Sequence, residues 1–229
     1  MLYDKDIREG LFEFLDENFG KNRIIEEKQI GKSRADAMMV TKDKIWGIEI
    51  KSDADTFARL ERQVKDYNRF FDYNIVAVGA SHASHIEEHV PDYWGIITIE
   101  DNGGIPDFYF LRQPKPNPKK EKAVMFRNQV SFLWRPELAH VQEINDMPKY
   151  KTLSKANVIK KIIEKVPADI LKEQVCQELF DRDYTTIADV LKEYKEASTK
   201  KSETKSVKTK TKSSASKAGS KHRSKTSQE

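Results

Sequence analysis

Two short apolar segments separated by a polar turn constrain the fold of this chain more than any other feature. Residues 34–40 and 45–51 have the composition of β-strands, and residues 41–44 have that of a hairpin turn. When the turn is centred midway through 41–44, residues that face each other across the hairpin have numbers that sum to 85. The sequence therefore predicts two antiparallel strands on which Asp36 lies directly opposite Glu49.

The charged residues of this hairpin are expected to gather on one of its faces. Side chains alternate along a strand, so Glu49 and Lys51 share one face while Ile48 and Ile50 share the other. Directly opposed carboxylates destabilise a sheet unless a cation compensates them. Lys51 supplies part of that charge, and a divalent ion held by Asp36 and Glu49 would supply the rest, since Mg²⁺ takes oxygen ligands. A cross-strand salt cluster on a solvated face is the alternative interpretation.

A helix is predicted directly after the hairpin. Residues 52–56 form a turn with good N-cap residues, and residues 57–71 follow with helical spacing of their apolar side chains. Gln63 and Tyr67 are four residues apart, so they lie on the same face of this helix. The apolar positions are Phe57, Leu60, Val64, Tyr67 and Phe71.

Three short motifs follow one another in this region: Arg34-Ala35-Asp36, Glu49-Ile50-Lys51 and Gln63-Val64-Lys65-Asp66-Tyr67. Together they resemble the PD-(D/E)XK nuclease superfamily, in particular the RecB-type members that carry a downstream Q-x-x-x-Y element. The longer string 47–53, followed by Arg59-Leu60 and Gln63, is similar to short members carried by bacteria and phages. The resemblance covers about residues 1–112. It departs from the superfamily's name at Ala35, where the name has proline, a position that varies widely among relatives.

The resemblance implies a metal-dependent deoxyribonuclease, with endonuclease and exonuclease action both left open. It implies catalytic roles for Asp36, Glu49 and Lys51, and a Mg²⁺ ion, with Mn²⁺ as a substitute. Asp36, Glu49 and the main-chain carbonyl of Ile50 would hold that ion. The bound metal would lower the pKa of a water molecule and neutralise charge on the phosphate, while Lys51 would orient the water or stabilise the transition state.

Further residues are implied around this centre. Gln63 and Tyr67 would position the phosphate strand or Lys51. In relatives an additional acid from the first helix or first strand often joins the metal site, and Glu9 and Glu26 are the candidates, with Glu27 behind them. An ordinary solvated glutamate is the alternative for each. The residues expected to contact nucleic acid are Arg34, Lys51, Arg59 and Arg62.

The order of the predicted elements indicates an α/β fold with a mixed sheet, and the resemblance implies the restriction-endonuclease-like version with helices on both sides. The segment from Ser81 carries His82, His85 and His89, whose spacing could gather three imidazoles for zinc. Without a thiol or carboxylate partner, exposed or structural histidines are the preferred interpretation. The expected helices and strands are a helix at 4–18, strands at 23–30, 34–40 and 45–51, a helix at 57–71, a strand at 75–78, a short helix from 81, and strands at 94–99 and 105–111.

Four regions are expected along the chain. They are a nuclease-like domain at 1–112, a Pro/Lys linker at 113–122 that should be extended and exposed, a helical extension at 123–197, and a Lys/Ser/Thr-rich tail at 198–229. In the extension we expect one helix that ends near 134 and restarts at 136. Further helices are expected at 158–166, at 167–180 and near 187–194. They would pack on the sheet or on each other, with a helix-turn-helix DNA reader as the alternative.

Charge and composition limit the class of protein. The tail has nine Lys and one Arg against two Glu, a net charge of +8, so the first 197 residues carry −4 of the chain's +4. The tail should be disordered, and it suits either attraction to phosphate backbones or solubility. The single cysteine, Cys176, and the lack of a long apolar run or signal-peptide core predict a soluble cytoplasmic protein without a membrane partner.

A general basic surface, the usual sign of a nucleic-acid binder, is absent from the first 197 residues, although a nuclease needs only a locally basic groove. The alternative function is therefore a non-catalytic nucleic-acid-binding or adaptor protein on a nuclease-like scaffold. DNA is the expected partner and RNA stays open, and a homodimer is one oligomeric state compatible with the sequence.

Overall fold

The computed structural model of this chain describes residues 4–118 and 122–183, so the helix expected near 187–194 and the tail at 198–229 lie outside the described residues. Residues Met1–Asp181 form one compact unit, and a second unit starts at Arg182. The strands are β1 (Arg23–Ile30), β2 (Ser33–Val40), β3 (Ile45–Lys51), β4 (Tyr73–Gly79), β5 (Gly95–Asn102) and β6 (Ile105–Arg112). The helices are α1 (Asp4–Phe19), η1 (Phe57–Arg59), α2 (Leu60–Phe70), α3 (Ala80–Ala83), η2 (Ile86–Glu88), α4 (Lys122–Val130), α5 (Arg135–Ile144), α6 (Lys155–Lys165) and α7 (Ala168–Phe180).

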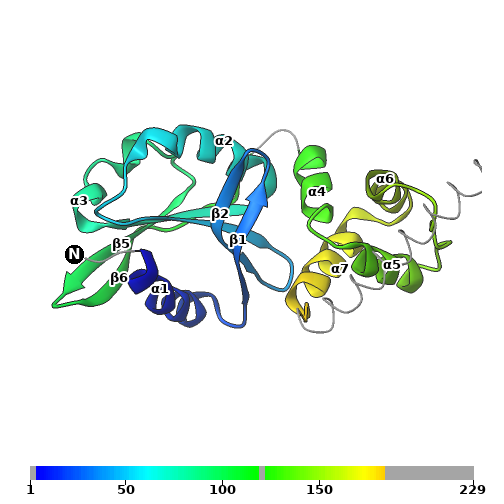
Figure 1. Cartoon of the computed structure of the whole chain (residues 1–229), viewed down its shortest axis with the longest axis horizontal. Coiled ribbons are helices and arrows are strands. Elements are labelled where there is room, and N and C mark those ends of the chain that lie inside the picture. The colour runs from blue at the N-terminus through cyan, green and yellow to red at the C-terminus, as the bar shows by residue number, and fades with distance from the viewer. Residues whose placement is uncertain (1–3, 119–121, 184–229) are drawn as a thin grey trace, which may run out of the picture. The chain divides into compact units, whose positions relative to one another are not determined.

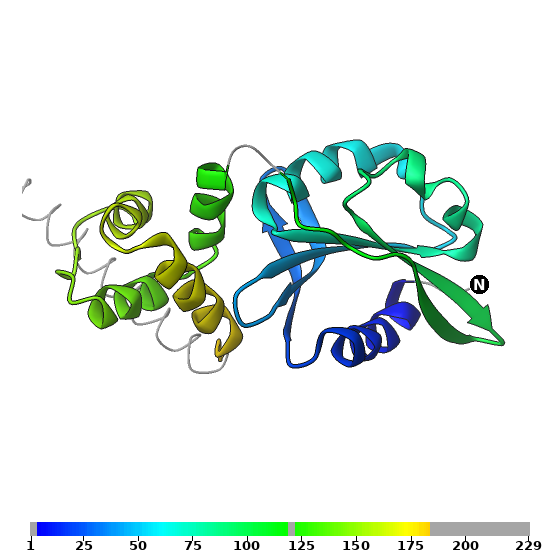
Figure 2. The ribbon, with the colours of Figure 1, turned by 180° about the vertical axis from the view of Figure 1, so that it is seen from behind.

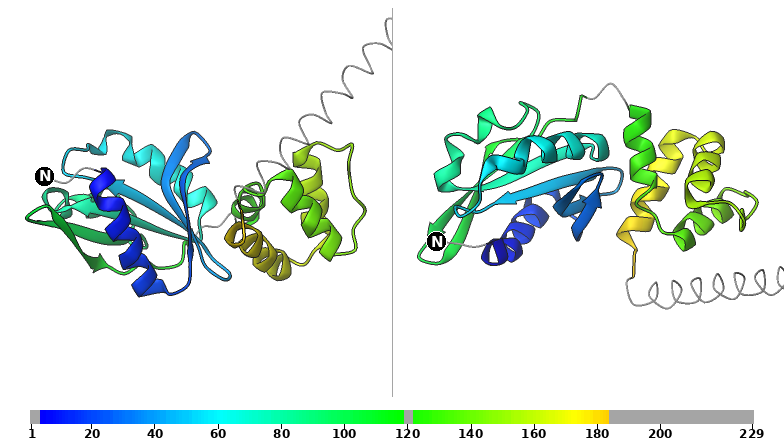
Figure 3. Two further views of the ribbon diagram at one scale, coloured as in Figure 1. Left: turned by 60° about the horizontal axis from the view of Figure 1, so that its bottom comes forward. Right: turned by 45° about the horizontal axis from the view of Figure 1, so that its top comes forward.

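The six strands form one mixed sheet in the order of the sequence, which confirms the predicted α/β class. Strands β1, β2 and β3 are antiparallel, β3, β4 and β5 are parallel, and β6 returns antiparallel to β5. Helix α1 covers one face of the sheet and α2 covers the other (Figures 1 and 2). Figure 3 shows α1 running across its face of the sheet in the left view.

Each face of the sheet has its own apolar core, because residues on a strand alternate between the two faces. The core under α1 includes Leu11, Trp46 and Ile48, whereas the core under α2 includes Tyr67 and Val76. The second core continues through side chains of α4, α5, α6 and α7, so the helices of the extension pack on each other and on the α2 side of the sheet domain. This packing agrees with the arrangement that the sequence led us to expect for the extension.

The linker contains neither helix nor strand in its described part, 113–118, and most of its residues are exposed. Asn117 differs from that expectation because it is 9% exposed. The predicted helix at 57–71 begins as the 3₁₀ turn η1 before α2, and the histidine segment divides into α3 and η2.

The hairpin between β2 and β3 has the predicted register. The residue pairs sum to 85 from Val40–Ile45 to Ala37–Ile48, and the Thr41 N–H donates to the Lys44 carbonyl in the turn. Regular pairing ends there, one pair before Asp36 and Glu49. Asp36 is not paired with Glu49 across the two strands. Its side chain accepts a hydrogen bond from the Ile50 N–H at 2.8 Å. The expectation of a directly opposed pair is thus wrong in detail, because β2 leaves β3 at this point.

Strand β6 lies at one edge of the sheet, and its backbone donors are partly occupied. Pro106 has no N–H group, and the Phe108 N–H donates to Oδ1 of Asp107 at 2.9 Å. On the same strand Ile105, Tyr109 and Leu111 are exposed. None of the described helices combines the length and apolar composition needed to cross a membrane.

Candidate active site

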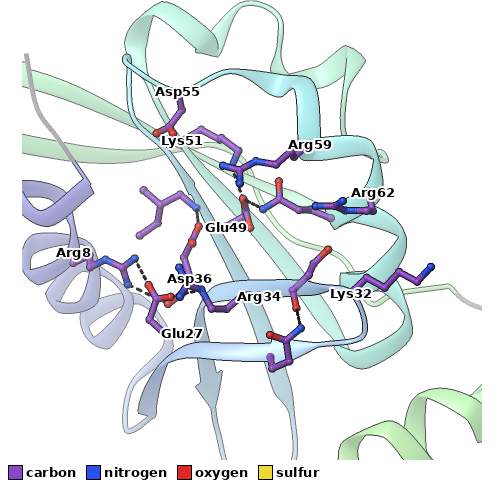
Figure 4. Close-up of a pocket in the computed structure, with 14 residues that line it drawn as sticks. Arg8, Glu27, Lys32, Arg34, Asp36, Glu49, Lys51, Asp55, Arg59 and Arg62 are labelled. Atoms are coloured by element: carbon purple, nitrogen blue, oxygen red, sulfur yellow. Dashed lines mark hydrogen bonds and ion pairs between the residues drawn. The ribbon is translucent and has the colours of Figure 1, made fainter.

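A pocket of about 540 Å³ opens where β2, β3 and the start of α2 meet, and its lining is almost entirely charged or polar (Figure 4). It contains most of the site residues expected from the sequence. The cations of the lining are Arg8, Lys32, Arg34, Lys51, Arg59 and Arg62, and the acids are Glu27, Asp36, Glu49 and Asp55. The remaining lining residues are Gln29, Ser33, Ile50 and Gln63.

Glu49 lies at the base of the pocket and is completely buried, on a central strand whose seven residues are all buried. Its carboxylate is surrounded by donors. Lys51 forms an ion pair with Oε1, Gln63 Nε2 donates to the same oxygen, and the Tyr67 hydroxyl lies 2.6 Å from Oε2. An ionised buried carboxylate requires such compensation. The predicted shared face of Glu49 and Lys51 is confirmed by this contact.

Gln63 and Tyr67 both hold Glu49, whose Oε1 also pairs with Lys51. Their expected role in positioning the phosphate strand or Lys51 stays a prediction. The Tyr67 hydroxyl also lies 3.0 Å from the Ile48 carbonyl. Gln63 lines the pocket, whereas Tyr67 is fully buried behind it.

Gly47 explains how α2 comes close enough to β3 for these contacts. A Cβ atom at this position would lie 2.2 Å from Cδ2 of Phe71 and 2.6 Å from Cδ1 of Tyr67. The missing side chain leaves room for both rings, so the Tyr67 hydroxyl reaches Glu49, two residues further along β3. Burial raises the pKa of Tyr67 well above its ordinary value, and the charges of Glu49 and Asp36 raise it further.

Asp36 lies at an irregular point of the sheet. On the β1 side, regular pairs occur at Glu26–Ala37 and Lys28–Ala35, and the residues between them, Glu27 and Asp36, are skipped. Glu27 has a φ of 55°, in the left-handed region that residues other than glycine seldom adopt. The pairing of β2 with β1 and with β3 is interrupted at this residue. The Asp36 carboxylate therefore turns into the pocket and accepts a hydrogen bond from the Ile50 N–H of β3.

Arg8 of α1 braces this irregular point. Its guanidinium donates to the Asp36 carbonyl at 3.1 Å, to Glu26 at 2.9 Å and to Glu27 at 3.0 Å. Arg34 pairs with the other oxygen of Glu27 at 2.5 Å. The acid that reaches the pocket is therefore Glu27, not Glu26, which contacts Arg8 outside the lining.

Glu9, the other candidate acid, is exposed on α1 and is not part of the lining. Arg8, its neighbour in the sequence, is the residue of α1 that reaches the pocket. No local pattern marks Arg8, because its partners are 18 to 28 residues away in the chain.

Three further cations line the pocket. Arg59 and Arg62 come from η1 and α2, and Lys32 comes from the turn between β1 and β2 (Figure 4). Within residues 4–118 and 122–183, none of the three side chains forms an ion pair. We call these three residues the cation wall. Arg59 and Arg62 were predicted as nucleic-acid contacts, and Lys32 was not.

Lys32 is held in place by Asp66, a buried residue of α2. The Asp66 carboxylate accepts the Lys32 N–H at 3.2 Å and the Ser33 hydroxyl at 2.7 Å. Gly31 makes this approach feasible, because its φ is 56° and a Cβ there would lie 2.7 Å from Oδ1 of Asp66. The tip of the β1–β2 hairpin is thereby fixed beside α2.

The histidines that suggested zinc are used for packing. The rings of His82 and His89 lie 4.7 and 4.4 Å from the Phe57 ring, and His82 Nε2 is 3.0 Å from the Asp55 carbonyl. His85 is exposed next to Glu88. No group of three or more His, Cys, Asp or Glu side chains able to hold a metal is present in the described part of the chain.

The donors of the pocket fit Mg²⁺ better than zinc. Asp36 and Glu49 offer hard carboxylate oxygens, and the thiols and imidazoles typical of zinc sites are absent from the pocket lining. Glu49 accepts three hydrogen bonds, and a carboxylate has about four acceptor positions, so one remains for a ligand. Mg²⁺ characteristically keeps several water ligands and needs only one or two carboxylates.

Comparisons with known proteins place the chain in a family. Among curated proteins, none is significantly similar in sequence. Among solved structures, a match is SfsA of Pyrococcus furiosus in complex with Ca²⁺, with 14% identity and a TM-score of 0.31. That match covers 49% of this chain and 64% of the other, less than two thirds of its length, and does not by itself establish a fold. The sequence model of the family described as bacteriophage P4 protein cII matches residues 1–211, so this chain belongs to the bacteriophage P4 protein cII family.

Proposed function

We propose that this protein is a Mg²⁺-dependent nuclease that hydrolyses phosphodiester bonds in DNA, on a sheet of the restriction-endonuclease-like type. One observation carries the proposal. The buried carboxylate of Glu49 is held by Lys51, Gln63 and Tyr67, next to Asp36, at the base of a pocket with a cation wall. Because a carboxylate repels phosphate and binds Mg²⁺, this arrangement favours a metal-dependent enzyme over a protein that only binds DNA.

Each residue of the centre has a distinct proposed role. Asp36, Glu49 and the carbonyl of Ile50 would hold the ion. Bound there, Mg²⁺ would lower the pKa of a water molecule and neutralise charge that develops on the phosphate. The Lys51 ammonium, 7% exposed, is fixed by Glu49 and would stabilise charge on a bound phosphate with little reorganisation. Gln63 fixes the remaining freedom of the Glu49 carboxylate.

The cation wall supports nucleic acid as the substrate. Arginine and lysine side chains without acidic partners are the groups that contact phosphates, and such contacts set the position of the strand rather than read its sequence. The wall also explains how a region with a net charge of −4 could bind DNA, since the positive charge is concentrated beside the carboxylates. The same wall would serve the alternative function, a nucleic-acid-binding adaptor without catalysis.

Incubation of the purified protein with circular and linear DNA, with and without Mg²⁺ or Mn²⁺, separates the two functions. We expect metal-dependent cleavage that falls by about 100-fold or more in Asp36→Asn, Glu49→Gln and Lys51→Ala, the size of effect seen when one transition-state contact is lost. Cleavage of the circle would identify endonuclease action.

Glu61→Gln is the matched control, because Glu61 is an exposed acid of α2 that pairs with Lys65 on the helix surface. It should cut DNA at the wild-type rate. DNA that binds but stays intact with both metals would overturn the nuclease proposal in favour of the adaptor.

A further inference from the structure

Helix α2 carries Arg62, Gln63 and Tyr67 of the proposed site near its start and middle, and its end is built in an unusual way. The last hydrogen bond of the helix runs from the Phe71 N–H to the Tyr67 carbonyl at 3.0 Å. The carbonyls of residues 68–71 come after it and have no partner within the helix, as at any helix C-terminus. Such groups are commonly satisfied by water or by a glycine cap.

Here all four carbonyls accept hydrogen bonds from side-chain amides of residues that follow the last strand in the sequence. The donors are Asn117 of the linker and Asn128 and Gln129 of α4, and we call these three residues the amide clamp. The bonds run from Asn117 Nδ2 to Asn68 O (2.9 Å) and Phe71 O (3.0 Å), from Asn128 Nδ2 to Arg69 O (2.9 Å), and from Gln129 Nε2 to Phe70 O (2.9 Å).

The amide clamp is itself held in place. Gln129 is 1% exposed, and its Oε1 accepts the Lys172 ammonium of α7 at 2.6 Å. Lys172 also bonds Asp72 at 2.5 Å, and the same carboxylate oxygen accepts the Ile45 N–H at 2.8 Å. Ile45 is the first residue of β3, the strand that carries Glu49. The end of α2 and the start of β3 are therefore fixed by one connected network of buried or half-buried polar groups.

We infer that the amide clamp is a positioning device for the proposed active site, so that the helical region 122–180 is part of the catalytic unit and not a separable module. The inference rests on the proposed function. Gln63 lies seven residues before Phe70, about 10 Å along the helix at 1.5 Å per residue. A shift of α2 along its axis would move Gln63 and Tyr67 with it, and these two side chains set the geometry of the Glu49 carboxylate. A misplacement of about 1 Å in such groups costs up to about 100-fold in rate.

The test is Gln129→Met in the full chain, because Met has a similar volume and no N–H donor. Two measurements are made below the melting temperature of every variant. The first is the NMR resonance of the Gln63 side-chain amide, assigned by its loss in Gln63→Glu. The second is kcat and KM for DNA cleavage. We expect the Gln63 resonance to move, and kcat to fall by about 10-fold to 100-fold with KM changed less than about twofold.

Gln174→Met is the matched control. Gln174 is a half-buried amide of α7 that bonds Asn145 of α5 at 2.9 Å and touches no carbonyl of α2. It should alter the melting temperature and leave the Gln63 resonance and kcat unchanged. Gln129→Glu keeps the acceptor for Lys172 but lacks the donor, so it should behave like Gln129→Met.

The outcomes separate this inference from the proposed function. If wild type cuts no DNA with any metal, the proposed function is wrong, while the Gln63 resonance still tests the amide clamp. An unmoved Gln63 resonance in Gln129→Met, or an equal movement in Gln174→Met, would overturn the inference. Should Gln129→Met fail to fold, Asn128→Ala removes a donor nearer the surface, and the same two readouts decide.

Discussion

Replacing Tyr67 with Phe removes one hydroxyl group from the base of the site and nothing else. That hydroxyl donates to Glu49 Oε2 at 2.6 Å and lies 3.0 Å from the Ile48 carbonyl, and both residues are completely buried. A hydrogen bond to a charged group contributes about 1.5–3 kcal/mol to stability. For a unit of 150–250 residues, 1 kcal/mol shifts the melting midpoint by about 2–4 °C. We therefore expect Tyr67→Phe to melt about 3–12 °C below wild type at pH 7.

The pH dependence of this difference provides a second measurement. The pKa of Tyr67 in the folded protein is raised well above its ordinary value by burial, so folding favours the protonated hydroxyl. Its contribution to the free energy of unfolding is complete below the unfolded pKa of about 10 and is lost as the pH rises from there toward the folded pKa. The gap between wild type and Tyr67→Phe should consequently narrow above about pH 10.

Tyr109→Phe is the matched control for this experiment. Tyr109 also donates to a carboxylate, Glu100 Oε1 at 2.7 Å, but on the exposed surface of β6. Differential scanning calorimetry of the three proteins from pH 7 to 11 should place Tyr109→Phe close to wild type throughout. Equal midpoints for Tyr67→Phe and Tyr109→Phe would refute the argument that the buried hydroxyl stabilises Glu49.

Three further perturbations follow from the same geometry. Gly47→Ala places a Cβ 2.2 Å from a Phe71 ring carbon, so thermal denaturation should show a loss of about 1–3 kcal/mol, and an unchanged midpoint would contradict the close packing. Mg²⁺ at about 100 times its dissociation constant should stabilise wild type by about 2.7 kcal/mol. Asp36→Asn should lose this shift yet melt no lower without metal, because Asn keeps an acceptor for the Ile50 N–H. Removal of residues 198–229 should weaken DNA binding and flatten its salt dependence, measured by fluorescence anisotropy, while turnover at saturating DNA persists.

The register of the central hairpin could be predicted from the sequence because a short turn fixes it. Once residues 41–44 are recognised as the turn, every pair up to Ala37–Ile48 follows from arithmetic. The same reasoning fails at Asp36, because the irregularity there depends on Glu27 adopting a left-handed backbone and on Arg8 bracing it from another element. No local propensity encodes either condition.

The contacts that hold the site were less accessible to prediction than its charged residues. The Q-x-x-x-Y spacing shows that Gln63 and Tyr67 share a face of α2, but not that the face meets Glu49. That depends on how closely the helix approaches β3, which Gly47 decides. The amide clamp joins residues that are 46 to 59 positions apart in the chain, so no motif of ordinary length contains it.

The edge strand β6 has a consequence for how the protein behaves at high concentration. An open strand edge is a template on which a second chain can add by backbone pairing, and such addition leads to aggregation or fibrils. Pro106 offers no hydrogen to an incoming strand, and the Phe108 hydrogen is already taken by Asp107. Chain-to-chain growth of the sheet is thereby blocked at two positions along an edge that also displays apolar side chains. Asp107→Val would reopen one of them beside exposed Ile105 and Tyr109, turning a protected border into a surface prone to self-association.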